Sequence, residues 1–336
     1  MSPPTVSSPR AEVDPLELLT AYQGSAIVAA AVRTGVADAL AEGPADAATV
    51  AAAKGLNERA VRMLLGAMVA LGLAVHDAGD RFRLSDSGAE LARAHPRSIA
   101  SIVEKEWFFY RVWAGLDEAI ADGRARIGPW RERLETDPAQ SRSFLLALDD
   151  LAARFGGELP GLAGADAAGR VLDVGGGAGS HAAALAAGGD GVEVTVLDLP
   201  AVEPILRERH PELRFVAGDL EAPRFGRPEG ERWDTVLLAN ILHDHSPERA
   251  GAIVAEAAGL LAPGGSLLLY EWVLNDDRDT PSAVALFALM MLLENEGGAA
   301  YTETELRGWL SAAGLDDVQV RRGGGPIAVV SGRSRS

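Results

Sequence analysis

Seven short apolar runs in the C-terminal half constrain the fold of this chain more than any other feature. The first five alternate with Ala-rich stretches of helical composition. Apolar strands that alternate with helices predict a parallel, doubly wound α/β sheet. The last two runs are separated only by residues 322–326, too few for a crossover helix, so this pair is predicted to be an antiparallel hairpin. The runs are Val171–Val174, Val194–Leu199, Arg214–Ala217, Asp234–Ile241, Ser266–Val273, Val318–Arg321 and Ile327–Ser331.

The N-terminal half has a different pattern. Helical periodicity covers residues 47–54 and 58–71, with a break at 55–57, and two short alternating segments follow at 74–76 and 81–84. Helix, turn, helix and a small hairpin form the winged-helix pattern. At roughly 100–200 residues per domain, 336 residues make about two domains. We therefore divide the chain into a Pro- and Ser-rich disordered tail (1–14), a mainly helical winged-helix domain (15–160) and the sheet domain (161–336).

A winged helix can bind DNA, but the charges argue against this. Residues 46–93 hold six basic and six acidic side chains, and the whole chain carries a formal net charge of −17. A duplex-binding surface needs a basic stripe to meet the phosphates. The pattern therefore favours a packing or dimerisation role over nucleic-acid binding. A winged-helix regulator remains an alternative, which a gel shift at low salt would reveal.

The chain contains no cysteine. This excludes disulfides, thiolate zinc sites and a cysteine nucleophile, and it fits a reducing compartment. The first residues lack the apolar core of a signal peptide, and no run of about 18 apolar residues exists to span a membrane. We expect a soluble cytoplasmic protein with no membrane partner.

A glycine-rich turn follows the first apolar run. Asp173 and Val174 lead into Gly175-Gly176-Gly177-Ala178-Gly179. Glycines at such a turn let the backbone bend tightly and approach a ligand closely. Ser180 stands where the dinucleotide fingerprint requires its last glycine, and no phosphate-loop Lys follows. The turn thus predicts a nucleoside site of another kind.

Two acids fall at the ends of the next two strands. Asp198 ends the second run, and Asp219 follows the third. Ligands of α/β sheets bind at the carboxyl ends of strands, so both acids are expected to face the glycine turn. One carboxylate can accept hydrogen bonds from ribose hydroxyls and the other from an adenine amino group, whereas both would repel a phosphate. Either acid alone could be a simple turn or cap residue.

This combination resembles the class I S-adenosylmethionine-dependent methyltransferases over residues 170–332. With the N-terminal half included, the chain is similar to the small-molecule O-methyltransferase family that dimerises through a winged-helix domain and includes plant phenolic and bacterial antibiotic-pathway enzymes. The resemblance implies S-adenosyl-L-methionine as cofactor, a small-molecule acceptor and a homodimer formed by the N-terminal domain. The cofactor-binding positions that it implies are Asp173, Gly175, Gly177, Asp198, Leu199, Asp219, Leu220, Ala239 and Asn240.

Two residues match the family's catalytic positions. His243 follows the fourth run, and Glu271 lies in the fifth. A phenol with a pKa near ~10 is mostly protonated at neutral pH, and an imidazole with a pKa around ~6.5 can remove its proton. The resemblance assigns His243 the role of general base, and it makes Glu271 the carboxylate that orients the imidazole.

Three departures from the family pattern stand out. His245 replaces the Trp of the common His-Asp-Trp sequence, Ala300 replaces the Glu of a Gly-Gly-x-Glu-Arg-Thr block, and Ala239 replaces a plant-type Lys. Glu294 and Glu296 are near enough in sequence to substitute for the missing Glu. The departures keep alternatives to O-methylation open: methylation of nitrogen or carbon, or use of the bound cofactor for hydroxylation, decarboxylation or rearrangement.

Aromatic and methionine side chains indicate an acceptor pocket, although each of them could also belong to the core or an interface. His243 and His245 form an H-x-H pair that could contribute to a metal site, but we assign no metal. Helical spacing within the aromatic cluster at 107–113 predicts Trp107 and Tyr110 as acceptor-binding residues, and the family resemblance implies Phe144, Leu148, Phe287, Met290 and Met291 as further ones.

Overall fold

The computed structural model describes residues 14–188 and 191–335. By its contacts the chain divides into two compact units, the first ending at Trp107 and the second beginning at Phe108. The sequence places the domain boundary later, at residue 160. The contacts divide the chain earlier because residues 108–160 carry side chains, such as Arg133 and Asp149, whose partners Glu294 and Arg209 belong to the sheet-bearing unit. Except for Asp14, the tail predicted for residues 1–14 lies outside the described residues.

The first unit contains the helices and the hairpin of the winged-helix pattern. Asn57 caps helix α5, since its side-chain oxygen accepts a hydrogen bond from the Ala60 amide at 3.0 Å, and Gly55 ends α4 in the left-handed region at φ 67°. The elements are α1 (Pro15–Thr20), α2 (Tyr22–Arg33), α3 (Val36–Ala41), α4 (Ala47–Lys54), α5 (Glu58–Ala70), β1 (Ala74–His76), β2 (Phe82–Leu84) and α6 (Asp86–Ala89).

The core of the first unit consists mostly of small aliphatic side chains. Val61, Leu65 and Met68, spaced three or four residues apart on one face of α5, are almost completely buried there. Arg62, exposed on the side of the same helix, pairs with Glu58 and Asp80. The helix that would serve as a recognition helix thus buries its main apolar face, and its exposed Arg62 is paired with two carboxylates. Helix α7 (Ala100–Val112) contains the boundary between the two units.

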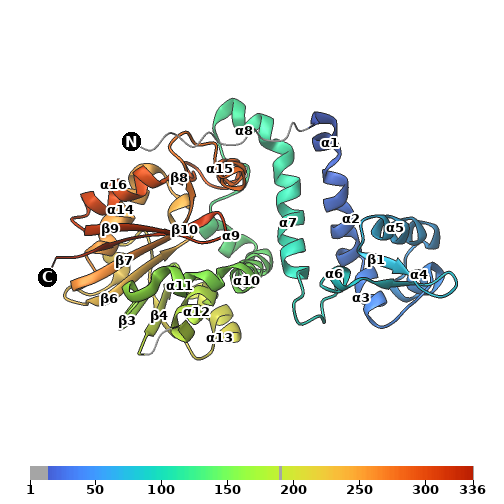
Figure 1. Ribbon diagram of the computed structural model, residues 1–336, viewed down its shortest axis with the longest axis horizontal. Coiled ribbons are helices and arrows are strands. Elements are labelled where there is room, and N and C mark those ends of the chain that lie inside the picture. The colour runs from blue at the N-terminus through green and yellow to red at the C-terminus, as the bar shows by residue number, and fades with distance from the viewer. Residues whose placement is uncertain (1–13, 189–190, 336) are drawn as a thin grey trace, which may run out of the picture. The chain divides into compact units, whose positions relative to one another are not determined.

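An eight-stranded sheet forms the centre of the second unit (Figure 1). Its strand order is β5-β4-β3-β6-β7-β10-β9, and the short β8 pairs with β7 outside that path. The doubly wound parallel sheet is therefore confirmed. The strands are β3 (Arg170–Val174), β4 (Glu193–Asp198), β5 (Arg214–Ala217), β6 (Trp233–Ala239), β7 (Leu261–Leu274), β8 (Tyr301–Thr302), β9 (Asp316–Arg322) and β10 (Ile327–Arg333).

The C-terminal hairpin is also confirmed. Strands β9 and β10 pair antiparallel, and β10 in turn pairs antiparallel with β7, so it lies between the two. Strand β8 has no counterpart in the sequence prediction, because two residues are too few to show an alternating pattern.

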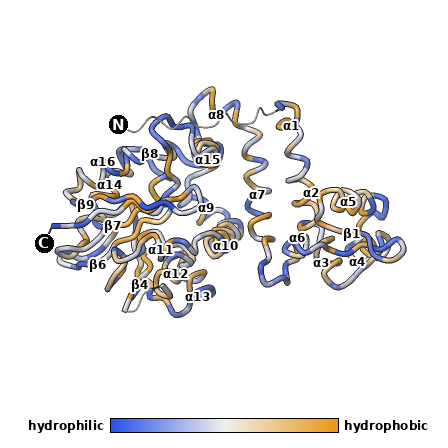
Figure 2. The backbone as a smooth tube through the Cα atoms, in the orientation of Figure 1, coloured by the Kyte–Doolittle hydropathy of each residue, from blue (hydrophilic) through white to orange (hydrophobic). Residues whose placement is uncertain are grey.

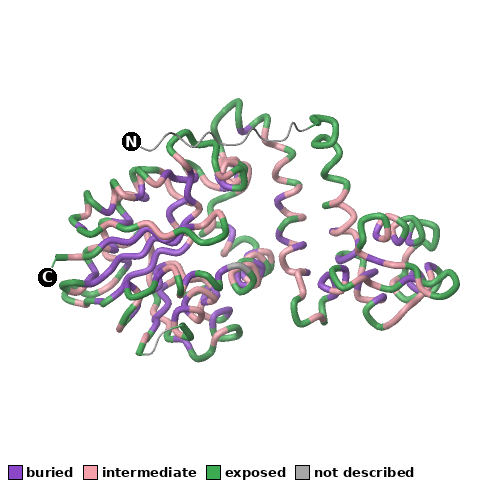
Figure 3. The backbone as a smooth tube through the Cα atoms, viewed as in Figure 1, coloured by how far each residue is buried: buried purple, intermediate pink, exposed green. Residues whose placement is uncertain are grey.

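Helices cover both faces of the sheet. Residues of α14 and α16 pack with Leu172, Val236 and Val330 on one face, and residues of α11 and α12 pack with Val171, Val196 and Val329 on the other (Figure 1). Hydrophobic residues run along the central strands in Figure 2, and β3, β6 and β7 are mostly buried in Figure 3, whereas the edge strands β5 and β9 are partly exposed. The helices are α8 (Leu116–Asp122), α9 (Trp130–Thr136), α10 (Pro138–Phe155), α11 (Leu159–Ala163), α12 (Ser180–Gly188), α13 (Glu203–Arg209), α14 (Pro247–Ala258), α15 (Ser282–Glu294) and α16 (Glu303–Ala312).

The topology determines where a ligand site can form. Strands β3 to β7 are parallel, so the residues that follow them emerge at one edge of the sheet. The glycine turn, the two strand-end acids and the segment with His243 all leave this edge. Within the described ranges, no helix combines the length and apolar character needed to cross a bilayer.

Candidate active site

The glycine turn packs too closely for side chains at two of its positions. A Cβ atom on Gly175, whose φ is 74°, would lie 2.4 Å from Cδ1 of Ile241. A Cβ atom on Gly176 would lie 2.5 Å from a carboxylate oxygen of Asp173. Gly177 also adopts a positive φ, of 55°. The turn therefore needs glycine both for its backbone angles and for its contact with the neighbouring loop.

Two carboxylates lie beside this turn. Asp198 accepts hydrogen bonds from the amides of Gly177 at 2.9 Å and Leu199 at 2.7 Å, yet burial outweighs these bonds and raises the pKa of Asp198 to about 6. Asp173 is completely buried, and neither of its carboxylate oxygens has a hydrogen-bond partner among the described residues. Burial, together with the charge of Asp198, raises the pKa of Asp173 to about 7.

The acid after the third strand already has a basic partner. Asp219 forms a 2.6 Å ion pair with Arg131 of α9, and the same oxygen accepts the Glu221 amide at 2.9 Å. The neighbouring Leu220 carbonyl accepts a hydrogen bond from Arg249. The sequence suggested the position of Asp219 but not its pairing with Arg131, 88 positions away.

A strained residue follows strand β6. Asn240 adopts φ 56°, its amide donates to the Tyr270 carbonyl at 2.9 Å, and its side-chain oxygen is buried without a partner among the described residues. Its side-chain nitrogen lies 3.3 Å from Nε2 of His181, a residue that the sequence analysis missed. Burial lowers the pKa of His181 to about 4, so this imidazole is neutral at physiological pH. Ala239, the last residue of β6, is buried in the core.

These residues fit the predicted nucleoside cofactor. Buried polar atoms are normally hydrogen-bonded, so unpartnered ones on Asp173, Asn240 and His181 mark a place where a polar ligand would supply the missing partners. The atoms without partners are mainly acceptors, which suit hydroxyl and amino groups better than a phosphate. The close-packed glycine turn beside them lets a ligand contact the backbone.

A buried histidine and glutamate lie at the ends of the next two strands. His243 follows β6 and is 7% exposed, and Glu271 lies in β7 and is 2% exposed. One oxygen of Glu271 lies 2.8 Å from Nδ1 of His243, and the other accepts the amides of Ile241 at 2.8 Å and Leu242 at 2.7 Å. Glu271 thus holds both the imidazole and the backbone turn that presents it.

The charge around His243 is strongly negative. Burial by itself would lower the pKa of His243, but the carboxylates of Glu271, Asp244 and Glu294 outweigh it and raise that pKa to about 9. The oxygen of Asp244 lies 3.8 Å from Nε2, on the other side of the ring from Glu271. Without a bound ligand, the His243 ring is therefore a positively charged imidazolium at neutral pH.

Comparisons with known proteins identify the family. A model described as an O-methyltransferase domain matches residues 113–316, and a model of the Rv2258c-like winged HTH domain matches residues 25–93. The chain belongs to the O-methyltransferase family. Its methyl donor, S-adenosylmethionine, is the cofactor that the sequence predicts.

Individual relatives resemble the chain over nearly its whole length. The tetracenomycin polyketide synthesis 8-O-methyltransferase of Streptomyces glaucescens is 30% identical over 330 residues, covering 95% of this chain and 96% of the relative. An O-methyltransferase family protein from Burkholderia thailandensis superposes with a TM-score of 0.86 at 28% identity, covering 97% and 99%. Human N-acetylserotonin methyltransferase, solved in complex with S-adenosylmethionine, has a TM-score of 0.83 at 26% identity, covering 98% and 100%.

The structure separates the two acids that the sequence suggested as substitutes for the missing family Glu. Ala300, which replaces the family Glu, is buried and has no charge to offer. Glu294, at the end of α15, is 5% exposed and pairs with Arg133 at 2.8 Å. Glu296 lies on the surface, 3.9 Å from Arg124. Of the two acids that the sequence suggested as substitutes, only Glu294 is buried.

The predicted acceptor residues lie in different surroundings. Phe287 contacts the His243 ring edge to face with centroids 4.8 Å apart, and it stacks on Trp272 at 4.6 Å. Met291 is buried, Met290, Phe144 and Tyr110 are half-buried, and Leu148 is exposed. Trp107 belongs to the first unit, where it packs on that core beneath Arg33. Among the aromatic members of this set, the ring contact with His243 comes from Phe287, and the acceptor roles of all seven stay predictions.

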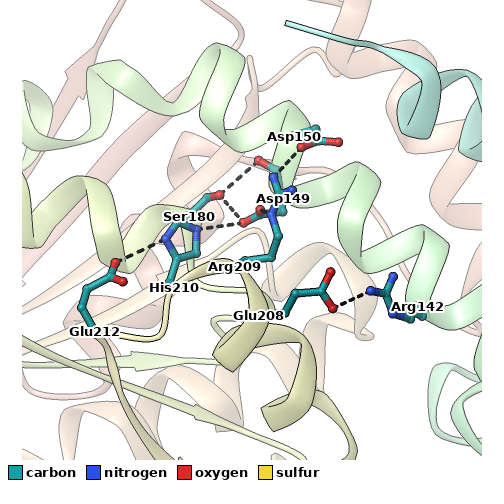
Figure 4. A network of polar contacts seen from close by, with 8 residues as sticks. All are labelled: Arg142, Asp149, Asp150, Ser180, Glu208, Arg209, His210 and Glu212. Carbon is teal, nitrogen blue, oxygen red and sulfur yellow. Dashed lines mark hydrogen bonds and ion pairs between the residues drawn. The ribbon is translucent and has the colours of Figure 1, made fainter. Parts of the chain in front are cut away.

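A polar network that the sequence analysis missed supports the glycine turn (Figure 4). Asp149 of α10 is 3% exposed and accepts hydrogen bonds from Ser180 and Arg209, and its oxygen lies 3.3 Å from Nε2 of His210. Ser180 directly follows Gly179, and Arg209 ends α13. The carboxylate therefore ties α10 and α13 to the residue where the turn becomes helix α12.

The H-x-H pair is not part of a metal cluster in the described chain. No group of three or more His, Asp or Glu side chains is arranged to hold an ion among the residues that the structure describes. Burial lowers the pKa of His245, and its carbonyl accepts a hydrogen bond from the Tyr301 hydroxyl.

Proposed function

We propose that the protein transfers a methyl group from S-adenosylmethionine to a hydroxyl of a small aromatic or polyketide-like secondary metabolite, with His243 as general base. The observation that carries this proposal is the buried His243–Glu271 pair at the strand edge that also bears the glycine turn. The similarity to the tetracenomycin polyketide enzyme supports the acceptor class.

The residues proposed to hold the cofactor have complementary chemistry. Asp198 would accept the ribose hydroxyls and Asp219 the adenine amino group, while Gly175 and Gly177 allow the backbone to approach. Asp173 and Asn240 would accept the amino protons of the methionine part. Leu199, Leu220 and Ala239 line the same strand ends. When bound, the cofactor supplies an electrophilic methyl group on a positively charged sulfur.

His243 and Glu271 would move the acceptor's proton. A carboxylate at Nδ1 favours the tautomer that carries hydrogen there, and this leaves the Nε2 lone pair free to accept the hydroxyl proton. Glu271 then stabilises the imidazolium that forms. Because the pKa of His243 is about 9 in the free protein, a second positive charge bound in the site would favour the neutral, basic form.

Incubation with labelled S-adenosylmethionine and a panel of phenols, naphthols and hydroxyquinones tests the proposal. We expect methyl ethers to form, and we expect His243→Gln to slow transfer by about 10²-fold or more while calorimetry shows unchanged cofactor affinity. Products labelled on nitrogen or carbon, or cofactor that binds without being consumed, would support the alternative activities. Absence of both transfer and cofactor binding would refute the proposal.

We also propose that the first unit forms a homodimer. Leu16, Leu18, Leu19 and Tyr22 of α1 and α2 are 52–69% exposed, which is unusual for large apolar side chains grouped within one segment. A second copy of the chain would cover them. This dimer would explain why a winged-helix unit with balanced charge is kept in an enzyme.

A further inference from the structure

Helix α9 buries a guanidinium next to aromatic rings. Arg133 is 8% exposed, and its carbon Cζ lies 5.2 Å from the ring centre of Trp130 and 5.6 Å from that of Phe144. Its Nη2 donates a hydrogen bond to Glu294 at 2.8 Å. Two rings and one carboxylate fix this group, so it keeps its orientation without help from a ligand.

The Nε donor of this fixed group is buried and has no hydrogen-bond partner among the described residues. Guanidinium carries five N–H donors and no acceptor, and a buried donor without a partner destabilises the protein. Since ring faces are poor substitutes for an oxygen, the Nε–H calls for an acceptor atom from outside the protein.

The surroundings connect Arg133 to the proposed base. Its partner Glu294 ends α15, the helix whose Phe287 contacts the His243 ring. The next residue, Asn295, donates a 2.7 Å hydrogen bond to Asp244, whose oxygen lies 3.8 Å from Nε2 of His243. Arg133 is thus linked, through Glu294 and the adjacent Asn295, to Asp244 on the Nε2 side of the imidazole, where an acceptor hydroxyl would have to approach.

The local charge restricts what the free donor can bind. In the free protein, and with the uncharged sulfur of S-adenosylhomocysteine bound, the carboxylates of Asp244, Glu271 and Glu294 exceed the positive charge of Arg133 and His243, so a further anion would be repelled. A neutral carbonyl oxygen accepts a hydrogen bond without adding charge. We infer that Arg133 is a specificity-determining residue that selects aromatic acceptors bearing a carbonyl oxygen in addition to the methylated hydroxyl. This inference rests on the proposed acceptor class.

Matched acceptors can test this inference by binding as well as by turnover. Each pair consists of two naphthols that carry either an acetyl or an ethyl group at the same ring position, and three pairs cover three different ring positions. Calorimetry measures the affinity of each compound for the protein saturated with S-adenosylhomocysteine. We expect the wild type to bind the acetyl member at least tenfold more tightly at one or more positions, and we expect Arg133→Met to abolish this preference. Equal binding of both members at all three positions by the wild type overturns the inference.

Two further variants separate recognition from folding. Glu294→Gln removes a charge that competes for the guanidinium, so the preference for the acetyl member should persist or increase. Arg142→Met removes an exposed arginine of α10 that pairs with Glu208, and it should leave the preference unchanged. Loss of preference in Arg142→Met as well would assign the effect to general damage and reject the role of Arg133. If the acetyl preference is present but no methyl is transferred, the proposed function fails and the recognition by Arg133 stands.

Discussion

The Glu271→Gln substitution probes the charge balance at the proposed base. Glu271 contributes the charge beside His243 in a site where burial alone would lower the imidazole pKa. A pKa raised from 6.5 to about 9 corresponds to about 3 kcal/mol of stabilisation of the folded state. Because the folded pKa is the higher one, this contribution is complete below pH 6.5 and disappears as the pH rises through about 9.

The expected result follows from that sign. Because Asp244 and Glu294 also contribute to the raised pKa, Glu271→Gln should remove part of this stabilisation and lower the free energy of unfolding by about 1–3 kcal/mol more at pH 6 than at pH 10. Any cost that does not depend on pH, such as weaker hydrogen bonds to the Ile241 and Leu242 amides, cancels in this comparison. The assay is urea unfolding followed by tryptophan fluorescence at the two pH values.

The matched control is Glu193→Gln. Glu193 is 65% exposed and lies 3.7 Å from Arg214, a surface pair whose contribution is about 0–1 kcal/mol at either pH. If Glu271→Gln lowers the free energy of unfolding by the same amount at pH 6 and pH 10, the reasoning is refuted.

In activity assays the acid limb of the wild-type kcat/KM profile, recorded with sub-saturating cofactor, should lie above pH 6.5. The variant should also lose about 10²-fold or more in kcat, because the amide favours the wrong imidazole tautomer.

Further substitutions test the support of the site and the assembly. Asp149→Asn should weaken cofactor binding and speed hydrogen exchange at the start of α12, and unchanged exchange there would contradict the role of the network. Gly175→Ala should destabilise the protein by about 1–3 kcal/mol and reduce cofactor affinity, whereas Gly308→Ala, in α16 with nothing within 4 Å of its added Cβ, should be neutral or stabilising by thermal unfolding. The double substitution Leu16→Ser and Leu19→Ser should convert a dimer into a monomer in sedimentation, and a monomeric wild type would disprove the dimer.

The sequence predicts those features that leave a local pattern. Alternating apolar runs predict the strands, the break at 55–57 predicts the start of α5, and a five-residue gap predicts the C-terminal hairpin. The sequence suggests His243 and Glu271 because the segment after the fourth apolar run and the segment within the fifth resemble family motifs. Their contact becomes visible only in the folded sheet, where β6 and β7 are parallel neighbours and bring the two residues together.

Pairings between distant side chains leave no such pattern. Arg133 and Glu294 are 161 positions apart, and Asp149 and Arg209 are 60 positions apart. A single charged residue in a helix is normally solvated, so neither member of such a pair signals burial by itself. His181 was missed for a similar reason, since one histidine at a helix start has many ordinary explanations.

The register between β6 and β7 has a consequence for how such enzymes diversify. Ala239 lies opposite Tyr270, so the spacing of His243 and Glu271 is fixed by main-chain pairing in the middle of the sheet. Helices α9, α10 and α15, which carry Arg133, Phe144 and Phe287, are attached through side chains instead. Substitutions in these helices would change the proposed acceptor-binding residues while the proposed catalytic pair keeps its geometry, so the same chemistry could be inherited unchanged as acceptors are exchanged.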